Sequence, residues 1–293
     1  MGRIMAFDTT RLLAQIKLKG AIPEGRFTDQ EILDVAYDTL IHNVAPWCVA
    51  NREEYYVYLT TSSITASQAA YPLPTRAQGM ALREAQIIRN STVTNLERMD
   101  LEEVVTSSEG QPGSFYVQNN ELMLYPTPNS SQYTLRMFYF LRPSKLVPTS
   151  EGALITAIDT GTNTLTVSAP SDWTTSNTFD LVKATSGFKT YSDGMDITAS
   201  AVSTSSITLA SLPSTLAVGD YVNLAEESCF PFIPLEAHGL LVHSCAAELL
   251  ESIGDREGFK IAEARVSKIK RDLETLFSTR VQGAPKNLFT PLL

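Results

Sequence analysis

The sequence is poor in the residues that carry most metal and redox chemistry. It holds three cysteines and three histidines among 293 residues. A zinc site needs about four ligands at short spacings, whereas His238, His243 and Cys245 lack a second cluster, and the two histidines fall on different faces of an expected helix. The odd number of cysteines, far apart and among apolar neighbours, predicts buried free thiols and a reducing compartment. We therefore expect no metal and no cofactor.

Basic residues and long apolar runs are scarce as well. Lys and Arg number 23 against 32 Asp and Glu, for a formal net charge of −9. Nucleic-acid-binding proteins are generally basic, but an acidic surface repels phosphates and would let DNA slide past without sticking. The sequence has no apolar stretch of about 18 residues and no apolar N-terminal region, so we expect no membrane span and no signal peptide.

Signatures of catalysis are also missing. No glycine-rich loop ends in the Lys-Ser/Thr pair of a phosphate-binding site, and His42 with Cys48 lacks a recognisable third partner. Acidic pairs occur at Glu53-Glu54, Glu102-Glu103 and Glu226-Glu227. Adjacency in sequence does not set the separation that a glycosidase needs, and solvated faces explain such pairs better. We expect a protein that is not an enzyme, with a cell-wall hydrolase as a remaining alternative.

Helical patterns open the chain. Residues 8–19 form an expected short helix with Asp8 or Thr9 as its cap and Gly20 as its stop. Thr28 and Glu31 have the spacing of a capping box at the start of a second helix, which Pro46 is expected to end.

The middle of the chain is rich in strands. A strand is expected at 55–60, a hairpin at 115–125 with Asn119-Asn120 as its two-residue turn, and a long strand at 133–141. Residues 149–228 are rich in Ser, Thr, Gly and Ala, with short strands between turns, which predicts an inserted small β-barrel or sandwich. Exposed aromatics could make this subdomain a glycan-binding module, and the candidates are Trp173, Phe188 and Tyr191.

Two further helical patterns precede the C-terminus, at about 235–253 and from 259 onward. The second has an apolar seam spaced alternately by three and four, which is typical of packed helices. The seam consists of Phe259, Ala262, Val266, Ile269, Leu273 and Leu276. The chain then loses its period and ends in an apolar segment, which we interpret as an extended tail that binds another protein.

These patterns predict an α+β fold, with a helical bundle built from both ends of the chain around a β-rich middle. The expected core comprises residues 1–148 and 229–280, the inserted β-subdomain residues 149–228, and the tail residues 281–293.

Several segments, taken in order, resemble the neck proteins of tailed bacteriophages. They are 27–33 (FTDQEIL), 71–79 (YPLPTRAQG), 82–85 (LREA), 124–128 (LYPTP), 135–143 (LRMFYFLRP), 218–222 (VGDYV), 234–238 (PLEAH) and 280–286 (RVQGAPK). The resemblance implies a structural head-to-tail adaptor, with a ring of about twelve copies beneath the portal. It implies as partners the portal protein, a tail or second neck protein, further copies of the chain, and DNA in passage, with no membrane.

The same resemblance implies that the chain resides in the virion neck, is found in the host cytoplasm during assembly, and serves genome ejection. It also implies that the C-terminal tail docks into the portal. The residues expected to make this contact are Arg280, Val281, Gly283, Pro285, Lys286, Leu288 and Phe289. The alternative function is a tail or baseplate component with a glycan-binding β module.

Overall fold

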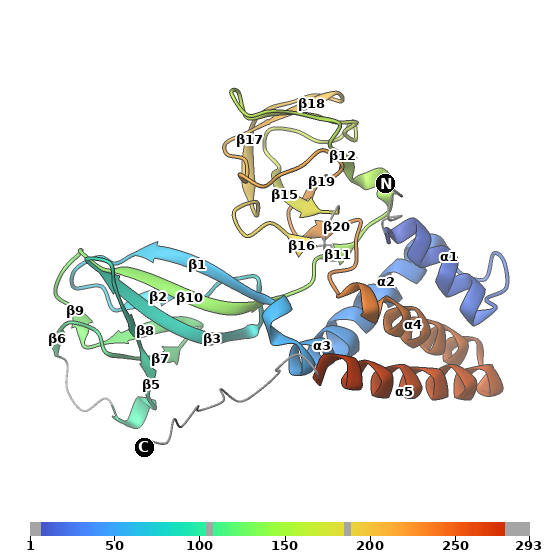
Figure 1. Cartoon of the computed structure of the whole chain (residues 1–293), viewed down its shortest axis with the longest axis horizontal. Helices are drawn as coiled ribbons and strands as arrows, with labels where there is room; N and C mark the ends of the chain where they lie inside the picture. Colours follow the sequence, from blue (N-terminus) through green and yellow to red (C-terminus); the bar gives the residue numbers. More distant parts are fainter. Residues whose placement is uncertain (1–6, 104–107, 185–188, 279–293) are drawn as a thin grey trace, which may run out of the picture. The chain divides into compact units, whose positions relative to one another are not determined.

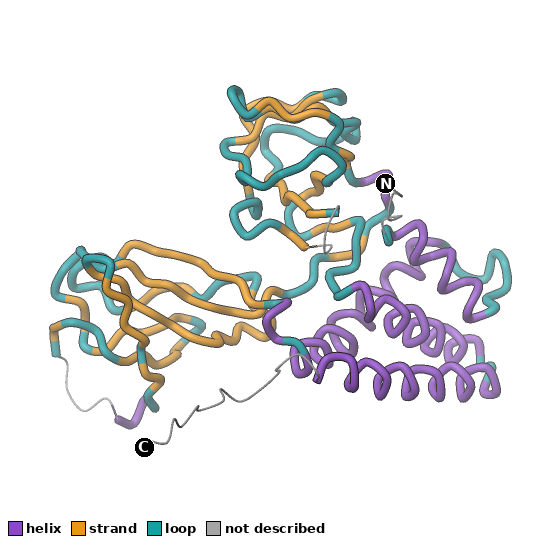
Figure 2. Tube along the Cα trace, viewed as in Figure 1, coloured by secondary structure: helices purple, strands orange, loops and turns teal. Residues whose placement is uncertain are grey.

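The computed structural model describes residues 7–103, 108–184 and 189–278, and it contains both helices and strands (Figures 1 and 2). The predicted α+β class is confirmed. The chain forms two compact units, one of residues 53–143 and the other of the segments before and after it. A separate unit at 53–143 did not follow from the sequence, while a domain of residues 1–148 and 229–280 stays a prediction.

The helices come from both ends of the chain, as expected. They are α1 (Thr9–Gly20), α2 (Asp29–Thr39), α3 (Ala45–Asn51), α4 (His238–Ile253) and α5 (Arg256–Ser278). Helix α4 packs against α1, α2 and α5, and so brings the two ends of the chain together (Figure 1). Among the described residues, no helix is both long and apolar enough to span a bilayer.

The predicted starts of the first two helices are confirmed. The Asp8 carboxylate accepts the Arg11 backbone N–H at 2.8 Å. The capping box is complete, because the Glu31 N–H donates to the Thr28 hydroxyl at 3.2 Å and the Thr28 N–H donates to the Glu31 carboxylate at 2.7 Å.

The prediction that Pro46 ends the second helical segment is wrong. The chain passes through a π-helical turn at Leu40–Val44 and continues as α3, with Pro46 in its first turn. Proline is tolerated in the first turn of a helix, where its missing N–H has no intrahelical partner. The wider π turn therefore allows helical backbone on both sides of the proline.

The unit of residues 53–143 is built from two four-stranded sheets. One has the order β1-β10-β3-β4 and the other β2-β8-β7-β5, while β6 and β9 form a separate short pair. Its strands are β1 (Val57–Ser63), β2 (Ala70–Pro72), β3 (Ala77–Arg89), β4 (Thr92–Asn95), β5 (Glu97–Arg98), β6 (Glu109–Gly110), β7 (Ser114–Gln118), β8 (Glu121–Tyr125), β9 (Thr127–Pro128) and β10 (Thr134–Leu141).

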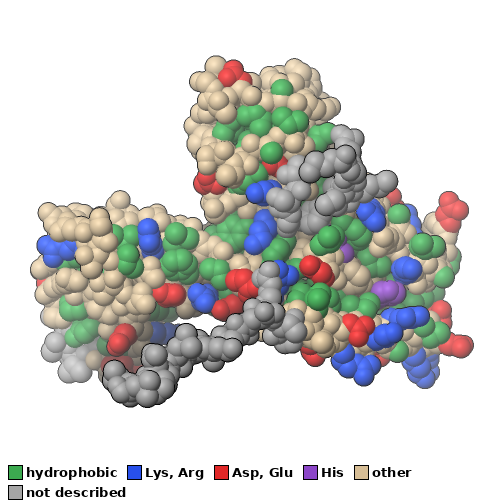
Figure 3. Space-filling model, in the orientation of Figure 1, with side chains coloured by type: hydrophobic (Ala, Val, Ile, Leu, Met, Phe, Trp, Pro, Cys, Tyr) green, Lys and Arg blue, Asp and Glu red, His purple; other side chains and the backbone are tan. Residues whose placement is uncertain are grey.

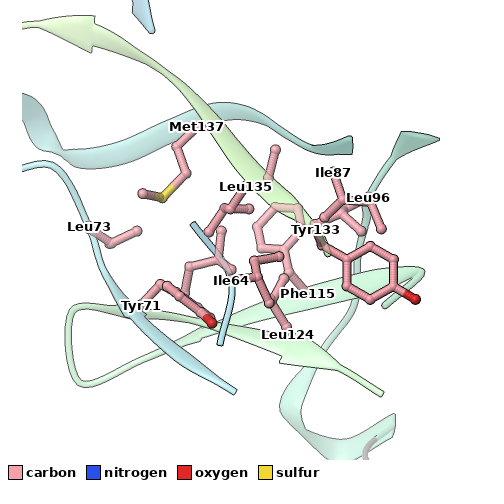
Figure 4. Packing of buried hydrophobic residues seen from close by; sticks show 12 residues of the cluster. Ile64, Tyr71, Leu73, Ile87, Leu96, Phe115, Leu124, Tyr133, Leu135 and Met137 are labelled. Carbon is pink, nitrogen blue, oxygen red and sulfur yellow. The ribbon is translucent and has the colours of Figure 1, made fainter. Parts of the chain in front are cut away.

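One apolar core joins these two sheets. Ile87 and Leu135 come from the first sheet, and Tyr71, Phe115 and Leu124 from the second (Figure 4). The predicted hairpin is confirmed as β7 and β8. Both residues of its Asn119-Asn120 turn have positive φ, 53° and 60°, which asparagine tolerates better than most residues.

Residues 153–224 form a sheet that curls into a half-barrel. Its order is β12-β19-β15-β17-β18-β14-β13, with β16 paired to β15, so the two end strands follow each other in the chain. The strands are β12 (Ala153–Leu154), β13 (Ala157–Asp159), β14 (Thr164–Thr166), β15 (Thr178–Lys183), β16 (Lys189–Thr190), β17 (Ile197–Val202), β18 (Ser206–Leu209) and β19 (Tyr221–Leu224). The predicted small β-barrel or sandwich is therefore present as a half-barrel, while a separate subdomain of residues 149–228 stays a prediction.

The chain enters and leaves the half-barrel through a pair of adjacent parallel strands. These are β11 (Lys145–Leu146) and β20 (Glu227–Ser228). Thr9, the first residue of α1, is hydrogen-bonded to the residue that follows each of these strands. Its N–H donates to the Cys229 carbonyl at 2.9 Å, and its hydroxyl donates to the Val147 carbonyl at 2.8 Å. These contacts attach the base of the half-barrel to the helices.

Candidate assembly surface

Helix α4 is the central helix of the helical part. Ten of its 16 residues are buried, because α1, α2 and α5 pack against it, whereas His243 and Glu248 are half-buried and Glu251 is exposed. It ends at Gly254, whose φ of 87° is a left-handed conformation that favours glycine. The Asp255 carboxylate then accepts the Gly258 N–H at 2.9 Å, which turns the chain directly into α5.

Helix α5 covers α4 with a narrow apolar face. Ala262 and Leu273 are buried, whereas Leu276 is 52% exposed. The other predicted seam residues, Phe259, Val266 and Ile269, are half-buried. Leu276 is thus a correction to the predicted seam. Phe277 is buried in its place, with its ring 6.0 Å from that of Trp47 on α3 and 5.4 Å from the Arg52 guanidinium carbon.

The period of the α-helix explains why Phe277 is buried and Leu276 is not. A strict alternation of three and four residues has a period of about 3.5, whereas a straight helix turns once in about 3.6 residues. Over the length of α5 the apolar face therefore drifts from the 276 position to the 277 position.

A groove opens where the end of α1 approaches α4 and α5. Its volume is about 490 Å³. Its lining includes Lys19, His243, Leu250, Asp255, Ile261 and Arg265. Lys19 and Arg265 line the same groove as His243, and burial together with their positive charges lowers the pKa of His243. We call this surface the basic groove, since Asp255 is the one acid in that lining and its carboxylate already caps α5.

Negatively charged side chains lie on another side of α4. Burial raises the pKa of Glu248, and the nearby carboxylates of Asp38 and Glu251 raise it further, while a hydrogen bond from Thr39 and the charge of His42 lower it. On α2 the exposed acids Asp34 and Asp38 lie one helical turn apart. We call Asp34, Asp38, Glu248 and Glu251 the acidic flank.

Two of the expected glycan platforms are part of the half-barrel core. Trp173 and Tyr191 are 6% and 7% exposed, and the Trp173 ring lies 5.3 Å from that of Phe179. The prediction that they serve as exposed platforms is wrong, because the half-barrel uses these large side chains to fill its interior. The third candidate, Phe188, lies outside the described residues.

The other predicted sites have mixed outcomes. The three cysteines are free and buried, as predicted. Glu53 pairs with Arg83 at 2.8 Å, which lowers the pKa of Glu53 and makes it a structural carboxylate.

The predicted portal contacts lie outside the described residues. They are Arg280, Val281, Gly283, Pro285, Lys286, Leu288 and Phe289. Within the described ranges, no three His, Cys, Asp or Glu side chains are grouped so as to hold a metal.

The basic groove and the acidic flank were not predicted. A signal was present, because α2 contains Asp29, Glu31, Asp34 and Asp38 and no base, while residues 264–271 of α5 contain four bases and no acid. Figure 3 shows Lys and Arg side chains gathered over α5. Sequence alone does not reveal which neighbouring helices these charges meet.

A buried histidine predicts that stability depends on pH. His238 is 3% exposed, with its ring centroid 4.2 Å from that of Phe7, and burial lowers its pKa from 6.5 to about 4. The unfolded state therefore binds a proton more readily, and stability is lost as the pH falls from 6.5 towards 4. The expected loss is about 3 kcal/mol, from about 1.4 kcal/mol per pKa unit.

Urea unfolding of the wild type and of His238→Gln between pH 7 and pH 4 measures this effect. Carboxylates titrate in both proteins, so the difference between their pH profiles isolates the histidine. Two parallel profiles would contradict the expected role of His238.

Comparison with known proteins identifies the family. No curated protein matches the chain. The sequence model of the SU10 adaptor protein family matches residues 10–176, which is more than half of the chain. The match extends from α1 through the unit of residues 53–143 into the first strands of the half-barrel, and it ends before α4 and α5. The chain thus belongs to the SU10 adaptor protein family, and with it to the structural components of bacteriophage particles.

Proposed function

We propose that this chain is a structural head-to-tail adaptor, which forms a ring of about twelve copies below the portal. The ring joins the capsid to the tail or to a second neck protein and lets DNA pass during packaging and genome ejection. The observation that carries this proposal is the family match over residues 10–176. In this role the chain acts in the virion neck, after a period in the host cytoplasm, and needs neither catalysis nor a cofactor.

Charge supports the passage of DNA. The chain has a net charge of −9, and an acidic lumen repels phosphates, so packaged DNA would meet little attraction as it moves. The bases of α5 would then belong at contacts between proteins rather than at the channel wall. The burial of Trp173 and Tyr191 weighs against the alternative of a glycan-binding tail component.

Complementation in vitro tests the proposed function. Heads and tails are purified from an infection in which the gene for this chain is inactivated, and the purified chain is added. We expect joined, infectious particles to appear in proportion to the added chain, and complete particles to gain nothing from it. Failure of the folded chain to join heads to tails would contradict the adaptor function.

A further inference from the structure

We propose that adjacent copies in the ring meet through two different sides of α4, with the acidic flank of one copy seated against the basic groove of the next. The inference rests on the proposed ring and deepens it, since it names the two surfaces that repeat around it. The occupant of the basic groove is thus a second copy of this chain.

Helix geometry places the two surfaces on different sides of α4. His243 and Glu248 are five residues apart, so at about 100° per residue their side chains point about 140° away from each other. Leu250, seven residues after His243, lines the same groove, whereas Glu251 points about 80° away from His243 and about 60° away from Glu248. A copy can therefore offer one surface to each of two neighbours.

The charges on both surfaces are available to a partner. Lys19 and Arg265 form no ion pair within 4 Å in the part of the chain that the structure describes, and neither do Asp38 and Glu251. Like charges instead lie near one another, because Lys19 and Arg265 line one groove, while Glu248 and Glu251 are one turn apart on α4 and Asp38 lies on the adjoining α2. Bringing the two surfaces together would relieve both repulsions at once.

The basic groove also exposes apolar surface that a neighbour would cover. Ile261, which lines it, is 61% exposed. Exposed apolar side chains ringed by charges are typical of an interface with an apolar centre and a polar rim.

A contact between unlike surfaces is heterologous. Repeated from copy to copy, it closes into a ring when the rotation per copy divides the circle. A two-fold contact built on one of these surfaces alone would pair that surface with itself and bring like charges together, which is unfavourable. The charge distribution thus favours a ring over a dimer.

Charge reversal tests this contact on heads that lack the adaptor. One variant carries Lys19→Glu and Arg265→Glu, and the other carries Asp38→Lys and Glu251→Lys. Each variant alone presents like charges across every contact, so we expect about tenfold fewer bound copies per head, or fewer still. An equimolar mixture restores opposite charges at each contact in an alternating ring, and we expect wild-type copy numbers.

The matched controls are Glu97→Lys and Arg98→Glu, which reverse exposed charges on β5. They should bind heads as the wild type does. Variants that assemble normally alone, or a mixture that gives no rescue, would overturn the proposed contact while leaving the adaptor function intact. Failure of the wild type itself to bind heads would instead count against the adaptor function.

Cross-linking tests the contact independently of heads. Because the native cysteines are buried, a chain with Asp38→Cys and Ile261→Cys has two accessible thiols, one on each surface. Treatment with a flexible bismaleimide, in concentrated solution and on heads, should give a ladder of covalent oligomers. No ladder in either condition, or dimers from Asp38→Cys alone, would overturn the proposal.

Discussion

Removal of residues 279–293 is expected to abolish head completion while leaving the protein folded. The deletion begins directly after α5, whose last buried side chain is Phe277. It removes an apolar segment that includes Leu288, Phe289, Leu292 and Leu293. Because the described fold ends at Ser278 and we predict that residues 280–289 contact the portal, the deletion should affect attachment to the portal rather than the fold.

We expect the truncated chain to unfold at the same temperature as the wild type and to yield at least a hundredfold fewer infectious particles, an estimate that corresponds to about 2.7 kcal/mol of lost binding energy. Complementation of adaptor-deficient heads measures the second quantity and calorimetry the first. A chain with residues 279–293 in scrambled order is the control for tail length and composition. Normal head completion by the truncated chain would contradict the assignment of portal binding to the tail.

Replacement of Asp180 in the half-barrel is expected to lower the stability of the protein. The Asp180 carboxylate is fully buried and accepts the backbone N–H groups of Asp196 at 3.0 Å and Glu226 at 3.1 Å. Both of these residues have positive φ, 54° and 64°, a conformation that costs energy for residues other than glycine. One carboxylate therefore fixes two strained turns.

We expect Asp180→Ala to lower the free energy of unfolding by about 3 kcal/mol, because two partly buried N–H groups lose the carboxylate that accepts their hydrogen bonds. Asp180→Asn, which keeps one carbonyl oxygen, should fall between this variant and the wild type. The exposed Asp193 provides the control Asp193→Ala. Denaturation followed by Trp173 fluorescence in a Trp47→Phe background reports on the half-barrel, and equal stability of Asp180→Ala and the control would contradict the expectation.

Local sequence signals predicted local structure well. The capping box of Thr28 and Glu31 and the Asn119-Asn120 hairpin depend on residues close in the chain, and both are present as predicted. The strand β17 (Ile197–Val202) was missed, because Ala and Ser dominate it and Ile197 is its one buried large side chain. Its place is set by hydrogen bonds to β15 and β18, which the local sequence does not encode.

The basic groove and the acidic flank also could not be predicted from local sequence. The acids of α2 and the bases of α5 are visible in the sequence, but the acidic flank also needs Glu248 from α4, and the basic groove needs Lys19 from α1. These residues are more than 200 positions apart in the chain and meet only after folding. The apolar seam of α5 differs from the prediction at its end. There the drift of the helical period by one residue buries Phe277 and leaves Leu276 exposed.

The most direct test of the central claim is the position and copy number of this chain in the virion, measured by electron cryomicroscopy of purified particles without imposed symmetry. The account predicts a closed ring of about twelve copies directly below the portal, around the path of the DNA. A location at the distal end of the tail, or scattered single copies on the capsid, would contradict it.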